Sequence, residues 1–280
     1  MTDAVWLQGT LLPRSLAHLD PLAHGFLHGL GIYDSLPLRH GTPVALSRHL
    51  RRLSDGAARL LLPAPAEETV RAAIQELSIA HQLTEGRIRI TLAAGPSASM
   101  QPGPSAENIT LITLTPLTPV KASAALTITP FRRNEHSPLA GIKFTACADN
   151  ILAQRAALAA GYDEAVFLNT AGALCEGAFS NLFLVRHGTV LTPALPGGCL
   201  PGVTRETVLA LCTAHGIPCA ESTLTAEDAA RADELFLTSS LRGLQPAHRL
   251  DGQELSAPGP VTRRLAALHA AWLDSSTSPI

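Results

Sequence analysis

Lysine is nearly absent from this chain, and cysteine and aromatic residues are scarce. Lys and Arg together number 21, but only Lys121 and Lys143 are lysines, so arginine supplies almost every positive charge. The five cysteines form no C-x-x-C pair, and their odd number argues against a disulfide framework or a cysteine-rich zinc site. We predict no metal site, because His24 and His28 have no clear third ligand.

Charge of one sign and long apolar runs are lacking as well. The formal net charge of −2 gives no general attraction for nucleic acid or anionic lipid. The N-terminus lacks the basic and then apolar pattern of a signal peptide, and no uninterrupted apolar run reaches the length of about 18 residues that suggests a membrane helix. Because 46% of the residues are hydrophobic, a sizeable core can form. We expect a globular cytoplasmic protein with neither nucleic acid nor membrane as a partner.

Hydrophobic patterns predict strands and helices without regular alternation, which favours an α+β fold, and neither a Rossmann fingerprint nor a P-loop motif occurs. A hairpin is expected to turn at His40-Gly41, and Ser47 is the expected N-cap of a helix that continues to about residue 61. The proline-containing stretch at 115–123 predicts a linker between a small N-terminal α+β domain (1–119) and a larger C-terminal domain (120–280). Further helices are expected over 67–81, 145–160, 204–215 and after Pro260, with strands at 3–8, 31–39, 87–94, 108–115, 124–130, 164–168, 181–185, 217–221 and 234–238.

Lys143 lies among apolar neighbours just before a predicted helix, whereas Lys121 lies in the linker. An amine in an apolar setting loses its proton more readily, and the neutral amine can attack a carbonyl to form a Schiff base, which arginine cannot do. Lys143 is therefore the candidate catalytic residue, and pyridoxal 5'-phosphate is the natural partner for a Schiff-base lysine. The alternative is an ordinary lysine at a helix entrance.

Pyridoxal phosphate needs an anion site for its phosphate and an acid for its ring nitrogen, and the sequence offers a candidate for each. A Pro201-Gly202 turn precedes a predicted helix, so the N–H groups of Val203 and Thr204 would point out of a helix N-terminus, which binds anions. Glu176 lies among small and apolar residues, where a carboxylate needs a partner. The alternatives are a plain N-cap threonine and a strand-end glutamate that faces water.

Other residues could bind phosphate or carboxylate groups. Arg52 lies on the first long predicted helix, where it is either a solvated charge or a bidentate phosphate ligand. Arg87 and Arg89 are two residues apart on a predicted strand and so share one face, an arrangement suited to gripping carboxylates. Ser239 and Ser240 could add hydroxyl or backbone donors.

Taken together, these motifs resemble the class-IV aminotransferases, the fold-type IV pyridoxal-phosphate enzymes. That family includes branched-chain aminotransferases, D-amino-acid aminotransferases and 4-amino-4-deoxychorismate lyases. The similarity runs from about residue 6 to residue 265, and several motifs in the right order are more specific than any one. They are His49-x-x-Arg52-Leu53, Gly141-Ile-Lys143, Gly161-Tyr-Asp-Glu-Ala165, Glu176-Gly-Ala-Phe-Ser-Asn-Leu-Phe183, Leu200-Pro-Gly-Val-Thr-Arg205, Ala232-Asp-Glu-Leu-Phe236 and Thr238-Ser-Ser-Leu241.

The resemblance implies a two-domain α+β fold, a small-molecule amino substrate and a homodimer with sites near the domain junction. It implies that Lys143 holds the cofactor as the internal aldimine and shuttles protons, and that Glu176 pairs with the pyridine nitrogen. Tyr33 matches a position that faces the substrate in the D-amino-acid group. The implied phosphate ligands are Arg52, Val203, Thr204 and Ser240, with Leu200 against the ring.

Two stretches, Ser137 to Lys143 and Thr238 to Pro246, look more like the lyase group than the aminotransferases. The activity we expect is therefore 4-amino-4-deoxychorismate lyase, which forms 4-aminobenzoate and pyruvate in folate biosynthesis. An amino-acid aminotransferase of branched-chain or D-amino-acid type is the alternative. Pro37 replaces an Arg that is usual in the family, and Ala148 replaces a Tyr found in many aminotransferases. These departures motivate a third hypothesis, a pyridoxal-phosphate-binding protein with little turnover.

Overall fold

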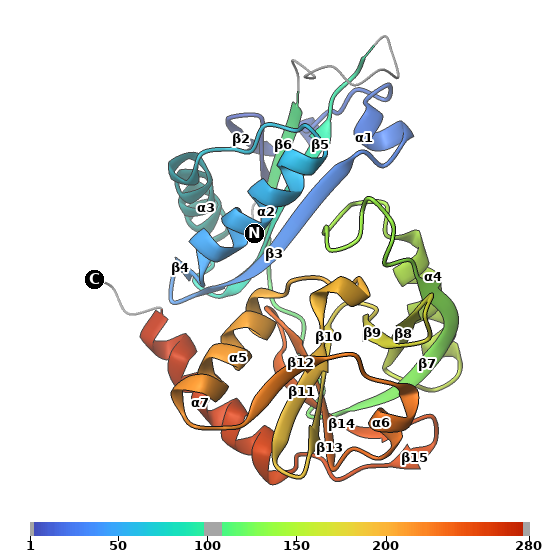
Figure 1. Ribbon diagram of the computed structural model, residues 1–280. Coiled ribbons are helices and arrows are strands. Elements are labelled where there is room, and N and C mark those ends of the chain that lie inside the picture. Colours follow the sequence, from blue (N-terminus) through green and yellow to red (C-terminus); the bar gives the residue numbers. More distant parts are fainter. Residues whose placement is uncertain (1–2, 98–107, 277–280) are drawn as a thin grey trace. The chain divides into compact units, whose positions relative to one another are not determined.

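The computed structural model describes residues 3–97 and 108–276, which divide into two compact units. Unit 1 contains the chain up to residue 118 together with 142–146, and unit 2 contains 119–141 and 147–275. Each unit is built around its own β-sheet with helices beside it, which confirms the predicted α+β class (Figure 1). That the units are domains divided near residue 120 stays a prediction.

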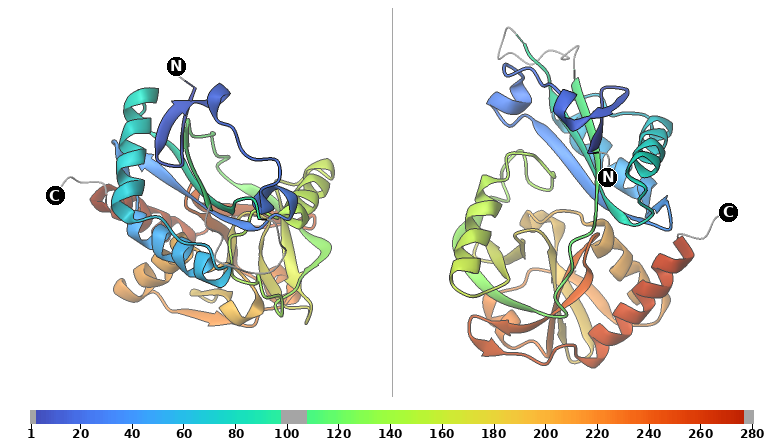
Figure 2. Two further views of the ribbon diagram at one scale, coloured as in Figure 1. Left: turned by 90° about the horizontal axis from the view of Figure 1, so that it is seen from above. Right: turned by 180° about the vertical axis from the view of Figure 1, so that it is seen from behind.

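Unit 1 is an antiparallel six-stranded sheet in the order β2-β1-β6-β5-β3-β4. Helices α2 and α3 lie along one face of this sheet (Figure 2). The strands are β1 (Ala4–Leu7), β2 (Thr10–Pro13), β3 (Gly31–Arg39), β4 (Thr42–Pro43), β5 (Gly86–Ala94) and β6 (Asn108–Thr115), and the helices are a 3-10 turn (Arg14–Leu16), α1 (His24–Leu27), α2 (Leu46–Arg59) and α3 (Glu67–His81).

The two faces of this sheet differ in chemistry because side chains alternate along β5. Ile88, Ile90 and Leu92 are fully buried in the core, whereas Arg87 and Arg89 project from the opposite face. The residues of β3 that pair directly with these arginines lie on that same face. The alternation therefore leaves one face of the sheet polar, as the spacing of the two arginines predicts.

The hairpin turn is confirmed, and one predicted helix cap is wrong. His40 and Gly41 have φ of 50° and 75°, the left-handed pair that a tight hairpin turn requires. The next helix begins at Leu46 after Ala45 in a left-handed conformation, so Ser47 is not its N-cap. The Ser47 hydroxyl instead donates to the Glu67 carboxylate on α3, which explains why a typical capping residue lies inside the helix.

Unit 2 is a nine-stranded mixed sheet in the order β12-β11-β10-β13-β14-β7-β8-β9, with β15 paired to β14. Its strands are β7 (Ala124–Arg133), β8 (Glu164–Asn169), β9 (Leu174–Gly177), β10 (Asn181–Arg186), β11 (Thr189–Pro193), β12 (Cys219–Ser222), β13 (Glu234–Ser239), β14 (Gly243–Leu250) and β15 (Gln253–Glu254). Its helices are α4 (Ala148–Ala159), a 3-10 turn (Leu195–Gly197), α5 (Val203–Ala214), α6 (Ala226–Ala230) and α7 (Pro260–Ser276).

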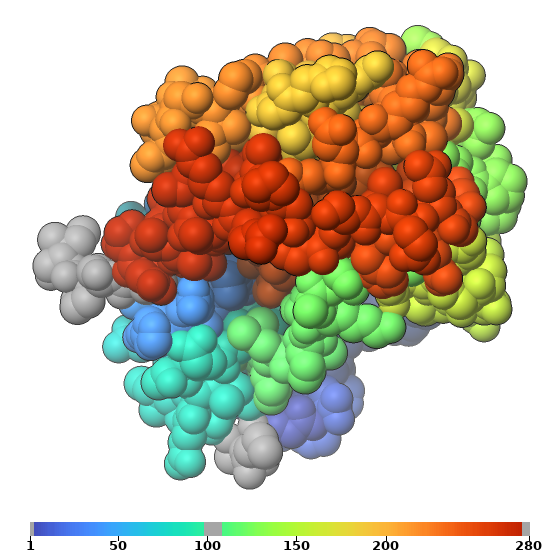
Figure 3. Space-filling model, turned by 90° about the horizontal axis from the view of Figure 1, so that it is seen from below, coloured from blue at the N-terminus to red at the C-terminus, as the bar shows by residue number. Residues whose placement is uncertain are grey.

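Alternation along the central strands β10 and β13 divides the core of unit 2 between two sides of the sheet. The rings of Phe183 and Phe236 are stacked with centroids 4.9 Å apart, and they pack with Val208 of α5 and Leu265 of α7. The intervening leucines pack on the other side, with α6. Helix α7 (red) forms part of the outer surface in Figure 3, so this helix covers the phenylalanine side.

Among residues 3–97 and 108–276, no helix is both long and apolar enough to cross a membrane.

We predict that the Phe183–Phe236 stack is a main source of stability in unit 2. Phe183→Ala should lower the free energy of unfolding by about 3–5 kcal/mol, because both transfer free energy and close packing are lost. Phe183→Leu should cost less than about 1.5 kcal/mol. Chemical denaturation measures both, with Ile79→Ala, at a side chain that is 71% exposed, as the control. Equal stability of Phe183→Ala and wild type would refute the prediction.

Candidate functional site

Lys143 is held in unit 1 by backbone hydrogen bonds to β3. The Tyr33 N–H donates to the Lys143 carbonyl, and the Thr145 N–H donates to the Gly31 carbonyl, each at 2.9 Å. Because 143–145 are extended along β3, the predicted helix start at 145 is wrong, and α4 begins at Ala148. This pairing brings the Lys143 amine to 4.6 Å from the centroid of the Tyr33 ring.

Tyr33 and Arg89, two of the three predicted substrate-binding residues, lie together with this lysine, and Arg87 lies on the same sheet face as Arg89. The Arg89 guanidinium carbon is 3.7 Å from the centroid of the same Tyr33 ring, within the range of a cation–π contact. Arg87 pairs with Pro37 across the β3–β5 ladder, and its Nε is buried without a hydrogen-bond partner in the described part of the chain. Unit 1 therefore has an amine and two guanidinium groups on or beside one sheet face.

Arg52 is already engaged in unit 1. Its Nε and Nη2 donate to the two oxygens of Asp34 at 2.9 and 2.7 Å, and His49 Nδ1 lies 2.8 Å from Oδ1 of the same carboxylate. Burial by itself would raise the pKa of Asp34, but the charges and hydrogen bonds of Arg52 and His49 outweigh it and hold that pKa well below its usual range. The predicted contact of Arg52 with phosphate stays a prediction.

Glu176 of β9 is largely buried in unit 2 and is paired on both oxygens. The Leu200 N–H donates to Oε2 at 2.8 Å, and Arg133 Nη2 lies 3.3 Å from Oε1. The two side chains are 12% and 13% exposed, so the charge pair is mostly shielded from water. Arg133 is therefore the partner that the apolar setting of Glu176 requires.

The loop before α5 is clamped in place. Asn181 Nδ2 donates to the Leu200 carbonyl at 2.8 Å, and a Cβ on Gly202 would lie 2.0 Å from Asn181 Oδ1, so only glycine fits there. Helix α5 starts at Val203 with Gly202 as N-cap and no side-chain cap, which leaves its first N–H groups for an anion. Val203 and Thr204 form this helix end, as predicted from the sequence.

A second group of donors follows β13 in the same unit. Thr238 pairs with Asn181 across the ladder, and its hydroxyl is buried without a partner among the described residues. Ser239 and Ser240 follow directly and begin the turn to β14. An unpaired buried hydroxyl and an uncapped helix end are both suited to phosphate oxygens, so the residues of unit 2 fit a phosphorylated ligand.

Sequence reasoning singled out none of four residues that the structure places at these sites: Asp34, Arg133, Asn181 and Thr238. Asn181 and Thr238 lie within recognised motifs, which was the available signal. Asp34 and Arg133 contact partners that are distant in the sequence, so no local pattern indicates these contacts.

Lys121, the other lysine, forms an ion pair at the surface. Its side chain is 74% exposed and pairs with Asp163 at 2.6 Å.

An amine held against a sheet face and an uncapped helix end are features that suit the binding of a phosphorylated aldehyde. The sequence model of the family described as amino-transferase class IV matches residues 31–250, and the chain belongs to this family. Class-IV aminotransferases bind pyridoxal phosphate.

Known relatives cover almost the whole chain and carry more than one activity. The crystal structure of a branched-chain aminotransferase from Thermoproteus uzoniensis is 28% identical, with a TM-score of 0.91 over 98% of this chain and 96% of that one. D-alanine aminotransferase from Bacillus licheniformis is 26% identical over 93% of this chain and 94% of its own. A Legionella pneumophila protein proposed as a 4-amino-4-deoxychorismate lyase is 25% identical, with a TM-score of 0.88 over 94% of this chain and 97% of that one.

We predict that Asp34 links stability to pH. Its pKa is lower in the folded than in the unfolded chain, so its stabilising effect is complete above about pH 4 and is lost as the pH falls through the folded-state value. Asp34→Asn should lower the free energy of unfolding at pH 7 by about 3 kcal/mol, since it leaves Arg52 without its charge partner. The difference from wild type should shrink on acidification.

Denaturant titrations between pH 7 and pH 3 measure this difference. Asp55→Asn, at an exposed position of α2, is the matched control and should change stability by less than about 0.5 kcal/mol. A pH-independent effect of Asp34→Asn would contradict the assignment.

Proposed function

We propose that the chain is a pyridoxal-phosphate-dependent amino-acid aminotransferase. The observation that carries this proposal is the arrangement around Tyr33, where the Arg89 guanidinium and the Lys143 amine lie 3.7 and 4.6 Å from one ring centroid. A fixed guanidinium is suited to a substrate carboxylate, and an amine beside it is suited to the adjacent α-carbon. The branched-chain and D-alanine aminotransferases among the relatives support the same activity.

The chain's own residues supply the binding groups. We propose that the N–H groups of Val203 and Thr204, with Ser240 and Arg52, hold the cofactor phosphate. Glu176 would be the negative partner that keeps the pyridine nitrogen protonated, and Leu200 would pack against the ring. Bound pyridoxal phosphate supplies an aldehyde that condenses with amines and a ring that withdraws electrons from the substrate α-carbon.

Proton transfer falls to Lys143 in this proposal. Its Nζ, as a neutral amine, would take the proton from the substrate α-carbon and hold it for return later in the reaction. The hydrogen bonds that fix 143–145 along β3 restrict where this amine can reach. Tyr33 packs beside the amine, and Arg87 and Arg89 orient the carboxylate so that the α-hydrogen is presented to Nζ.

A lyase is the second candidate, and two observations favour it. The stretches Ser137 to Lys143 and Thr238 to Pro246 resemble the 4-amino-4-deoxychorismate lyases, and the Legionella protein proposed as such a lyase shares the fold. The lyase would use the same proton removal by Lys143. It would then break the C–O bond of the ring ether to expel pyruvate, driven by aromatisation, and would need no keto acid.

A binding protein with little turnover is less well supported by the structure. Its motivation was the loss of an arginine at Pro37 and of a tyrosine at Ala148. Arg87 lies directly opposite Pro37 on the same face of the sheet, so a guanidinium is still present at this place. We propose that Arg87 takes over the role of the missing arginine.

We also propose that the chain is a cytoplasmic homodimer. Helix α4 exposes Ile151, Leu152 and Leu158, with exposed fractions of 45%, 55% and 55%. Large apolar side chains gathered on one helix are typical of a surface that another protein covers. A second copy of this chain is the partner that the family resemblance implies.

We predict that Lys143→Ala abolishes turnover. The loss should be at least about a thousandfold, because the variant lacks both the attachment point of the cofactor and the proton-transferring amine. Lys121→Ala is the matched control, since Lys121 is the other lysine and is paired with Asp163 on the surface. It should retain wild-type activity. Comparable activity of Lys143→Ala and wild type would refute the proposed function.

Two assays of the wild-type protein separate the candidates. Pyridoxal phosphate with an L-branched-chain amino acid or D-alanine and 2-oxoglutarate tests for transamination, followed as glutamate formation. Aminodeoxychorismate without any keto acid tests for the lyase, followed as 4-aminobenzoate fluorescence. We expect transamination to be the faster reaction. Rapid release of 4-aminobenzoate by a protein that shows no transamination would establish the lyase instead.

The proposed homodimer is tested by light scattering coupled to size-exclusion chromatography. Wild-type protein should elute with about twice the chain mass of 29.4 kDa. Leu152→Arg should shift the population toward the monomer, because a charge in an apolar interface is costly. A monomeric wild type would rule the dimer out.

A further inference from the structure

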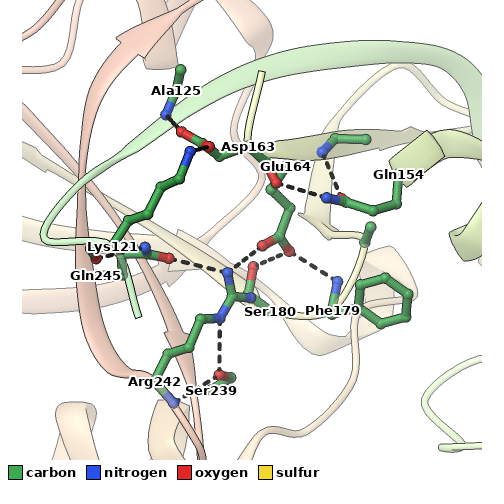
Figure 4. A network of polar contacts seen from close by, with 12 residues as sticks. Lys121, Ala125, Gln154, Asp163, Glu164, Phe179, Ser180, Ser239, Arg242 and Gln245 are labelled. Atoms are coloured by element: carbon green, nitrogen blue, oxygen red, sulfur yellow. Dashed lines mark hydrogen bonds and ion pairs between the residues drawn. The ribbon is translucent and has the colours of Figure 1, made fainter. Parts of the chain in front are cut away.

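Unit 2 contains a buried ion pair that the proposed chemistry does not use. The Glu164 side chain is 2% exposed, and Arg242 Nη1 donates to its Oε2 at 2.5 Å (Figure 4). Glu164 begins β8, and Arg242 lies in the turn between β13 and β14. The Arg242 side chain is 23% exposed, but the Glu164 carboxylate is buried, and a buried carboxylate is costly unless both of its oxygens are satisfied.

Glu164 fixes the turn that joins β9 to β10. Its Oε1 accepts hydrogen bonds from the Phe179 N–H at 2.9 Å and the Ser180 hydroxyl at 2.7 Å. A Cβ on Gly177 would lie 2.5 Å from the same oxygen, so the carboxylate is pressed against the backbone beside Glu176. Glu176, the proposed partner of the pyridine nitrogen, is therefore the neighbour in sequence of Gly177, against which the Glu164 carboxylate lies.

Arg242 fixes the turn that carries the serines. Its backbone N–H and its Nε both donate to the Ser239 hydroxyl at 3.3 Å. Its Nη1 also donates to Gln245 Oε1 at 3.0 Å, and Gln245 Nε2 donates to the Lys121 carbonyl at 3.0 Å. Figure 4 shows these contacts converging on one guanidinium. Ser240, a proposed phosphate ligand, lies inside the turn that this guanidinium closes.

We propose that the Glu164–Arg242 pair positions the Ser239–Ser240 turn for the phosphate of the cofactor and ties it to the turn that follows Glu176. This inference rests on the proposed function, because it takes Ser240 as a phosphate ligand and Glu176 as the ring partner. Arg242 and Glu164 are positioning residues, since neither is assigned a contact with cofactor or substrate. Their effect is to keep the groups that bind the phosphate and the group that binds the ring nitrogen of the cofactor at a fixed spacing.

Arginine is needed at this place for a geometric reason. One planar guanidinium reaches the Glu164 carboxylate through Nη1 and the Ser239 hydroxyl through Nε, whereas a lysine ammonium is a single point of charge on a flexible chain. A lysine at 242 would keep the ion pair and the backbone hydrogen bond to Ser239, and would lose the side-chain bond from Nε. The two functions of Arg242, neutralising Glu164 and closing the serine turn, can therefore be separated by substitution.

The test compares two ligands of the full-length protein by isothermal titration calorimetry after removal of bound cofactor. Pyridoxal phosphate and pyridoxal share the ring and the aldehyde and differ in the phosphate, so the ratio of their affinities reports the phosphate site alone. Arg242→Gln should lower this ratio at least about tenfold, the effect of losing one hydrogen bond to a charged group. Glu164→Gln should lower it in the same direction.

Arg242→Lys and a matched control complete the design. The lysine variant should fold like wild type and should lower the ratio by a smaller factor, about threefold, because it keeps charge beside Glu164 and loses the bond to Ser239. If Arg242→Gln does not fold, the affinity ratio of Arg242→Lys tests the inference instead. Arg249→Gln removes an arginine of β14 that bonds to the Gly161 carbonyl instead, and it should leave the ratio unchanged.

An unchanged ratio in folded Arg242→Gln, or in Arg242→Lys if the former does not fold, would overturn the inference. Equal weakening of both ligands would overturn it too, because that result indicates a general loss of structure. Failure of the proposed function gives another pattern. If the wild-type protein binds no pyridoxal phosphate, or binds it no better than pyridoxal, both the proposed function and the inference are refuted. If wild-type binding and turnover are normal, the results with the variants test the inference only.

Discussion

A carboxylate that is buried in protein needs a positive partner or several hydrogen-bond donors, and arginine provides that partner for three carboxylates in the two units. Asp34, Glu164 and Glu176 are each shielded from water, and each is paired with an arginine. A guanidinium offers several directed donors, so a single arginine can satisfy the carboxylate and a neighbouring oxygen at the same time. The abundance of arginine in this sequence therefore has a structural use, since lysine could supply the charge of these pairs but not their geometry.

Lys143 differs from these arginines, because its proposed role is chemical. Its backbone is held by hydrogen bonds to β3, and its amine lies against an aromatic ring. An amine on a flexible chain can exchange one partner for another during a reaction more easily than a guanidinium fixed by two or three directed hydrogen bonds. Under the proposed function, the two kinds of cation have different roles that follow from their chemistry: arginines fix the geometry of buried carboxylates, and Lys143 transfers the proton.

Local signals in the sequence predicted many of the elements, and contacts between distant residues account for the errors. Helix α3 has the predicted bounds, because its apolar spacing and its boundaries are local. The start of α4 was placed too early, since pairing of 143–145 with β3 overrides their helical pattern. Strand β14 was missed because Gly243 and Pro246 disfavour strands. Residue types at the candidate site could be predicted, but Arg242 and Glu164 are 78 residues apart, and no local pattern joins them.

The close approach of Glu164 to Gly177 makes this position sensitive to substitution. Where the hydrogen of glycine stands, a methyl carbon would come within 2.5 Å of the carboxylate oxygen and 2.2 Å of the Ser180 hydroxyl. Even Gly177→Ala would therefore displace the Glu164 carboxylate. Because this carboxylate contacts both the β9–β10 turn and Arg242, both turns would be disturbed. Glycine at 177 is therefore part of the arrangement that keeps the Glu164 carboxylate in place.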